Sequence, residues 1–134
     1  MSVESISWWI PITPVAKGRP RFCVRGKFVS AYTDKKTREY EKNVLSESLS
    51  YAPKRPLTGA ISATMVFYMT RPKSLAKSVK HHVKKADLDN LIKAILDPLN
   101  KVFFNDDSQI IHISASKCYA TDKVGISIVL QEIE

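Results

Sequence analysis

Hydrophobic and polar residues change period several times along this chain, and each change predicts a different element. Loose alternation predicts a strand over residues 5–12, and two short β segments within residues 22–29 predict a hairpin. A 3.6-residue apolar stripe predicts a helix over residues 34–51. The clearest strand spans residues 58–69, where every second residue on one face is apolar.

The second half of the chain begins without any period. Residues 70–86 predict a long loop, and loops of this length in compact domains are usually functional or disordered. A helical stripe follows over residues 87–102, in which Pro98 is expected to kink or divide the helix. Residues 109–119 and 124–130 alternate again, and the short link between them predicts an antiparallel hairpin.

The composition agrees with one α+β domain over residues 1–134, with a mixed sheet of about five strands and two main helices. A chain of 134 residues suits one domain, and its 44% hydrophobic content is sufficient for a core. Cys23 and Cys118 lack the spacing of a zinc site or a disulfide framework. No apolar run reaches the ~18 residues of a membrane span, so we expect a cytoplasmic protein with no membrane contact.

The distribution of charge adds a functional indication. The net charge of +8 suits a polyanionic partner. Residues 17–27 and 71–85 are rich in Lys and Arg and contain no acid, and an acidic cluster follows directly. The cluster consists of Asp87, Asp89, Asp97, Asp106 and Asp107. Carboxylates repel DNA unless a cation lies between them, so this arrangement is unusual for a protein that only grips phosphates.

The acidic cluster contains a pattern suited to metal chemistry. Asp87 and Asp89 can converge on one side whether their stretch is a helix cap or still extended. Lys93 lies four residues after Asp89 on the same helix face, and a return from helix to strand can carry Asp107 back toward them. A few carboxylates are enough to hold Mg²⁺, which activates water and relieves charge on a phosphodiester. Lys93 would complement the transition-state charge or orient the water.

These residues also have simpler explanations. An Asp at a helix start most often only caps it, and an Asp in a turn usually only shapes that turn. Asp97 can reach toward Lys93 at i+4, but a surface ion pair is the simpler expectation for it, and any one basic loop residue can be merely solvated. The grouping of acids after a basic loop nevertheless favours a nuclease-like site with basic residues on the phosphates. The expected DNA contacts are Lys17, Arg19, Arg21, Lys73, Lys77, Lys80, Lys84 and Lys85.

The motifs together resemble those of a known nuclease family. The run DLDNLIKA at residues 87–94, LD at 96–97 and NDDSQI at 105–110 resemble the signature of RusA-type Holliday-junction resolvases. The segment PVAKGRPRF at residues 14–22 is similar to one found in many members, but it is less diagnostic. The signature covers about a quarter of the chain and is specific as a set.

The resemblance implies a RusA-like fold and a Mg²⁺-dependent endodeoxyribonuclease. Such an enzyme resolves four-way DNA junctions by paired nicks near the crossover, in recombination and repair, and acts as a homodimer; the family is common in prophages. Carried over to this chain, Asp87, Asp89 and Asp107 would be the Mg²⁺ ligands and Lys93 the catalytic lysine. The link from helix to Asp-Asp is about one residue shorter than in comparable members, which leaves both Asp106 and Asp107 open as the third ligand.

Two other functions fit the same residues. A phage protein that binds nucleic acid without catalysis would tolerate Asp-to-Asn changes at Asp87, Asp89 and Asp107, with no cleavage to lose. A nuclease of the same chemistry would act instead on flapped DNA or RNA. Cleavage of these substrates under identical salt conditions separates the possibilities.

Overall fold

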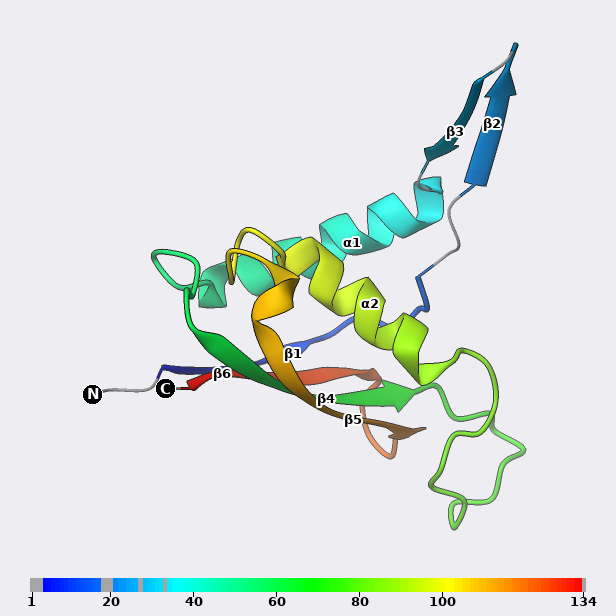
Figure 1. Ribbon diagram of the computed structural model, residues 1–134. Coiled ribbons are helices and arrows are strands. Elements are labelled where there is room, and N and C mark those ends of the chain that lie inside the picture. Colours follow the sequence, from blue (N-terminus) through cyan, green and yellow to red (C-terminus); the bar gives the residue numbers. More distant parts are fainter. Residues whose placement is uncertain (1–3, 18–20, 27, 33, 134) are drawn as a thin grey trace.

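The structure, a computed structural model, describes residues 4–17, 21–26, 28–32 and 34–133 (Figure 1). Its elements are β1 (Ser5–Ile10), β2 (Arg21–Arg25), β3 (Phe28–Tyr32), α1 (Lys35–Ser48), the 3-10 turn η1 (Leu49–Tyr51), β4 (Ala60–Met69), α2 (Leu88–Leu99), the 3-10 turn η2 (Asp107–Gln109), β5 (Ile110–Tyr119) and β6 (Gly125–Ile133). The predicted α+β class is confirmed. The mixed sheet has four strands rather than five, in the order β1-β6-β4-β5, because β2 and β3 pair with each other as a separate hairpin.

The core lies between one face of the sheet and the two helices, which lie on the same side of it (Figure 1). β4 is central and carries the predicted apolar face: Ile61, Ala63 and Phe67 are fully buried. It pairs in parallel with β5 and antiparallel with β6. These side chains belong to the same buried cluster as the α2 stripe, so burial of apolar surface fixes α2 on the sheet.

Helix α2 forms as its apolar stripe predicts, and Leu91, Ile95 and Leu99 are fully buried. Pro98 does not divide the helix, which ends one residue later at Leu99. A proline in the last turn removes one backbone donor where the helix is already ending, so the cost of a break within the helix is avoided. The stripe position Val102 lies in the turn beyond the helix.

The predicted hairpin between β5 and β6 is wrong. β4 lies between these two strands, and the chain passes around its end, where the Ala120 N–H donates to the Met69 carbonyl (2.8 Å). β5 therefore becomes an edge strand, and its alternating apolar residues are only partly covered. Ile111 is 65% exposed and Ile113 is 43% exposed. The β4–β5 register also shifts by one residue near Ile111, as in a β-bulge.

Candidate metal and DNA-binding site

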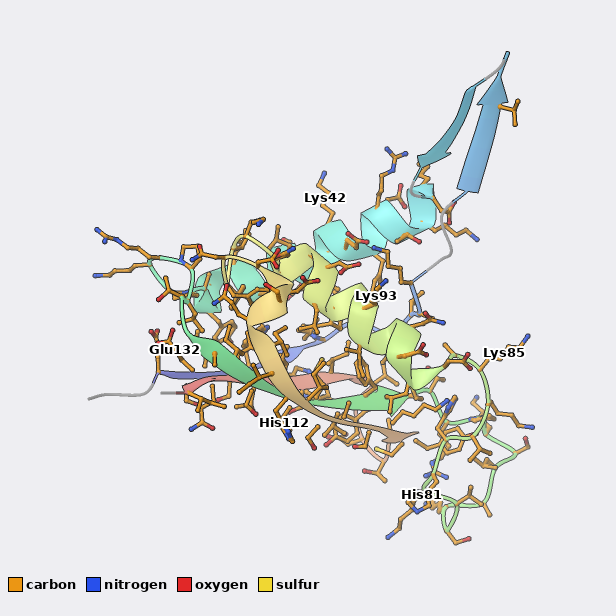
Figure 2. The ribbon with its side chains drawn as sticks, viewed as in Figure 1. Lys42, His81, Lys85, Lys93, His112 and Glu132 are labelled. Atoms are coloured by element: carbon orange, nitrogen blue, oxygen red, sulfur yellow. The ribbon has the colours of Figure 1, made fainter. Side chains whose placement is uncertain are left out.

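Asp87, Asp89 and Lys93 lie together on the first turns of α2, as predicted. Asp87 is the N-cap residue with an extended backbone, but its side chain makes no capping hydrogen bond. All three side chains are exposed, and Figure 2 shows Lys93 projecting from the helix. The contacts of the described residues include no ion pair or hydrogen bond from any of the three side chains. Two free carboxylates therefore stand at the positive end of a helix dipole, one turn from a free ammonium.

Asp107 lies at the opposite end of α2 from these residues. Two residues before Asp107, the Asn105 N–H donates to the carbonyl of Leu57 (3.3 Å), which lies just before the start of β4. The start of α2 is instead near the end of β4, since the carbonyl of Ala86 accepts a hydrogen bond from Lys117 on β5 (2.7 Å). A helix of 12 residues spans ~18 Å. Within a single chain, Asp107 therefore does not return to the helix start, although a turn from helix to strand can allow this.

The separation of the carboxylates has a direct consequence for metal binding. Within the described residues, no three His, Cys, Asp or Glu side chains lie close enough together to hold a metal ion. One chain offers a pair of carboxylates, Asp87 and Asp89, at the start of α2 and a third, Asp107, beyond the other end of the helix. The helix axis and the parallel direction of β4 and β5 fix this arrangement, so a change of side-chain rotamer does not close it.

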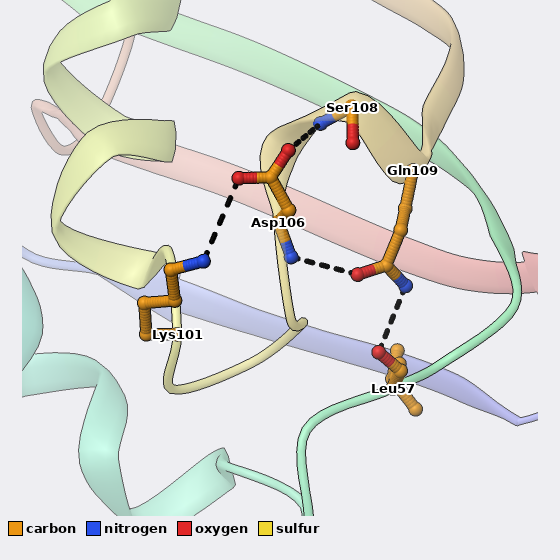
Figure 3. Close-up of polar contacts among 5 residues, drawn as sticks. All are labelled: Leu57, Lys101, Asp106, Ser108 and Gln109. Carbon is orange, nitrogen blue, oxygen red and sulfur yellow. Dashed lines mark hydrogen bonds and ion pairs between the residues drawn. The ribbon is translucent and has the colours of Figure 1, made fainter.

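Asp106 and Asp107 differ sharply in their contacts, although they are neighbours. The Asp106 carboxylate caps η2 by accepting from the Ser108 N–H (3.1 Å), and the Gln109 side chain accepts from the Asp106 N–H (2.8 Å), which completes a capping box (Figure 3). Lys101 approaches Asp106 to 3.6 Å. The exposed Asp107 side chain makes no such contact in the described structure.

The same contacts keep Asp106 ionised. Hydrogen bonding from Ser108, through its side chain and its main-chain N–H, lowers the pKa of Asp106, and the Lys101 charge adds to the effect. Gln109 then ties the turn to the sheet, because its amide group donates to the Leu57 carbonyl (2.8 Å; Figure 3) and to the Gly59 carbonyl (2.9 Å). Asp106 thus serves the turn, and Asp107 is held beside it with its carboxylate free.

Lys17 has structural partners that the sequence did not indicate. Its side-chain ammonium forms ion pairs with Asp97 and, at 3.5 Å, with Glu41. Its main-chain N–H donates to the Asn90 carbonyl (3.1 Å). The ion pair expected of Asp97 is therefore present, with Lys17 as its partner, and the described contacts include none between Asp97 and Lys93. Burial alone would lower the pKa of Lys17, but the hydrogen bond and charge of Asp97, together with Glu41, outweigh it and raise the pKa.

These contacts place two of the sequence motifs side by side. The segment that ends at Lys17 runs against the start of α2, so the PVAK stretch lies next to DLDN. Nothing in the sequence indicated this contact, because Lys17 and Asp97 are 80 residues apart along the chain. A contact between Lys17 and DNA stays a prediction, and the structure gives this side chain a second role in holding the N-terminal segment on α2.

The family model described as endodeoxyribonuclease RusA matches residues 11–131. The chain belongs to the RusA family. The resemblance stated from the motifs is thereby confirmed, and RusA membership implies a nuclease that acts on Holliday-junction DNA.

The match extends well beyond the aspartate motif and includes the N-terminal segment that contacts α2. A relative from Bacillus subtilis (strain 168), described as uncharacterized protein YqaN, is 29% identical over 141 residues, which cover 98% of this chain and 99% of the relative. Among the described helices, none combines the length and apolar character required to span a bilayer.

The basic loop of this RusA-family chain is anchored at one end of β5. Arg71 donates to the Ala76 carbonyl (2.8 Å) and lies over the Tyr119 ring at 5.3 Å. His82 is buried edge-on against Tyr119, and burial, followed by the Lys117 charge, lowers its pKa. These contacts hold the loop backbone while its lysines stay exposed. No described ion pair includes Lys73, Lys77, Lys80, Lys84 or Lys85.

The other predicted DNA contacts cannot be placed in the same way. Arg19 lies outside the described residues. Arg21 begins β2, and its side chain lies outside the described part of the structure. The hairpin that follows stands away from the sheet and the helices (Figure 1). Contacts of Arg19 and Arg21 with DNA stay predictions.

Proposed function

We propose that this protein is a Mg²⁺-dependent, structure-selective endonuclease that resolves Holliday junctions by paired nicks near the crossover. The observation that carries the proposal is the pair of free carboxylates, Asp87 and Asp89, one helical turn from the free ammonium of Lys93. The basic loop that leads into them carries five exposed lysines without described ion pairs. RusA membership supplies the reaction class.

The donor set fits Mg²⁺, which takes hard oxygen ligands and usually keeps several waters. Asp87 and Asp89 offer such oxygens, and no described cation competes for them. We propose that the protein is a homodimer and that Asp107 of the second copy is the third ligand, since the Asp107 of the same chain lies at the far end of α2 and Asp106 is already engaged as a cap and by Lys101. Bound at these residues, the ion would supply an activated water and relieve charge on the phosphodiester oxygens.

The lysines of the chain would have two separate tasks. The backbone of Lys93 is held in place, because Leu91 and Ile95, two residues before and after it on the helix, are fully buried. Its ammonium would donate hydrogen bonds to the phosphoryl oxygens as negative charge develops there. The loop lysines would contact phosphates of the junction arms and position the DNA without reading its sequence.

Cleavage of an end-labelled four-way junction, compared with a linear duplex in Mg²⁺ and in EDTA, tests the proposal. We expect paired nicks near the crossover in Mg²⁺ only, and an uncut duplex. Junction binding without any cleavage would instead support a non-catalytic binding protein. Faster cleavage of flapped DNA or RNA in the same buffer would transfer the chemistry to another substrate.

The loop lysines make a second prediction possible. Each phosphate contact that is lost reduces the slope of log K against log salt by about 0.9, so replacing Lys80 and Lys84 with alanine should flatten it by about 2. The measurement is junction affinity at several salt concentrations. Replacing Lys42 and Lys54, which are exposed on and beyond α1, with alanine is the matched control and should leave the slope nearly unchanged. Equal slopes for both double variants would remove the loop from the DNA interface.

A further inference from the structure

Lys117 lies on the core-facing side of β5, where an apolar residue would be expected. It is paired across the sheet with Phe67 of β4, which is fully buried, and paired residues of neighbouring strands point to the same face. Lys117 is half-buried, and no ion pair among the described residues includes it. A charged group at such a position is costly unless other groups accept its hydrogen bonds.

The acceptors are two main-chain carbonyls at the end of the basic loop. The Lys117 ammonium donates to the carbonyl of Lys84 (2.6 Å) and to that of Ala86 (2.7 Å). Ala86 is the residue immediately before Asp87, the N-cap of α2. Hydrogen bonds from a charged donor are about twice as strong as those between neutral groups. The sheet therefore holds the chain firmly at the point where it enters the proposed metal site.

The backbone of Asp87 is held from both sides. On one side, Lys117 fixes the preceding peptide group through the Ala86 carbonyl. On the other side, the Asp87 carbonyl accepts from the N–H of Leu91 (3.1 Å), which is fully buried against the sheet. The Asp87 side chain makes no described contact of its own. The place of its carboxylate therefore depends on these two backbone anchors.

We propose that Lys117 is a positioning residue for the metal site, whose ammonium holds the peptide before Asp87 so that this carboxylate is presented beside that of Asp89. The inference rests on the proposed nuclease function for the role of the two carboxylates. Lys117 acts through the backbone and touches neither the ion nor the DNA. Removing a group that orients metal ligands in this way typically costs about 10- to 100-fold in metal affinity or activity.

Other contacts already hold the basic loop at the end of β5 (Figure 1). His81 forms a β-bridge with Cys118, and the Tyr119 N–H donates to the Lys80 carbonyl (2.9 Å). These anchors attach the loop to the sheet without Lys117. What Lys117 adds is confined to residues 84–86, directly before the carboxylate pair, and this favours a role in the site over a general role in attaching the loop.

Lys117→Met tests this role, because methionine is a long apolar side chain that cannot donate a hydrogen bond. We expect the Kd for Mn²⁺, measured by electron paramagnetic resonance, to rise about 10- to 100-fold. Junction affinity in EDTA should stay that of the wild type. Lys117→Arg should recover most of the Mn²⁺ affinity, since a guanidinium can donate to both carbonyls. Lys42→Met, which changes an exposed lysine of α1, is the control and should match the wild type.

Amide hydrogen exchange without metal separates positioning from a general loss of stability. The Leu91 N–H donates to the Asp87 carbonyl, so its protection reports on the order of the Asp87 backbone. In Lys117→Met this protection should fall, whereas the Phe67 N–H in the central strand β4 should keep its wild-type protection. The melting temperature should likewise stay close to that of the wild type.

The outcomes separate this inference from the proposed function. A Lys117→Met protein that binds Mn²⁺ as tightly as the wild type would overturn the inference, whether or not its junction affinity falls. Equal losses of protection at Leu91 and Phe67 would also overturn it, because Lys117 would then stabilise the whole fold. If Mn²⁺ affinity and Leu91 protection fall as expected but the wild-type protein cuts no branched DNA, the positioning role stands and the proposed nuclease function fails.

Discussion

Replacing Asp89 with asparagine is expected to abolish junction cleavage while junction binding stays the same or tightens. The change replaces one of the two charged carboxylates of the Asp87–Asp89 pair with a neutral amide of nearly the same size, which is a weaker ligand for Mg²⁺. We expect the cleavage rate to fall at least about 1000-fold, which corresponds to about 4 kcal/mol of transition-state stabilisation. Binding should not fall, because a carboxylate facing phosphates repels them when no cation lies between. Single-turnover cleavage and gel-shift affinity of the same junction measure the two effects.

The control for Asp89→Asn is Glu47→Gln, which removes the charge of an exposed carboxylate on α1. It should cut at the wild-type rate, and both variants should melt within a few degrees of the wild type, since losing one acid from the first turn of a helix costs about 0.3–1 kcal/mol. An Asp89→Asn protein that cuts at a normal rate would remove this residue from the site.

The elements with strong local patterns could be predicted from the sequence. β4 and α2 have apolar periods of two and 3.6 residues, and both form where these periods predict them. The pairing of β5 with β6 could not be predicted, because their short link suggested a hairpin whereas β4 lies between them. That order depends on which strand has the most fully apolar face, a property of the whole sheet. Local turn signals do not contain it.

The candidate site divides in the same way. Asp87, Asp89 and Lys93 lie within one stretch of seven residues, so the helix alone brings them together. The pairing of Lys17 with Asp97 and the distance from Asp107 to the helix start are set by tertiary packing, which no local spacing records. One signal was available: Asp106 and Gln109 have the spacing of a capping box, which assigns Asp106 to the turn.

The two adjacent aspartates of that turn provide the second large effect. We expect Asp107→Asn to lose cleavage as severely as Asp89→Asn, at least about 1000-fold, while its melting temperature stays that of the wild type. The reason is that the exposed Asp107 carboxylate makes no described contact within the chain, so nothing in the fold depends on it. The same junction assay and a thermal melt give both numbers.

Asp106→Asn is the matched control one residue away, and Asp106→Ala separates capping from charge. Asparagine caps a helical turn about as well as aspartate, so Asp106→Asn should cut within about tenfold of the wild type. Asp106→Ala loses the acceptor for the Ser108 N–H and should lower the melting temperature. If Asp106→Asn abolished cleavage and Asp107→Asn did not, the third ligand would be Asp106. The contacts of Asp106 with Ser108 and Lys101 would then have to break before the metal binds. Lys101→Ala, which removes one of these contacts, would therefore increase the cleavage rate.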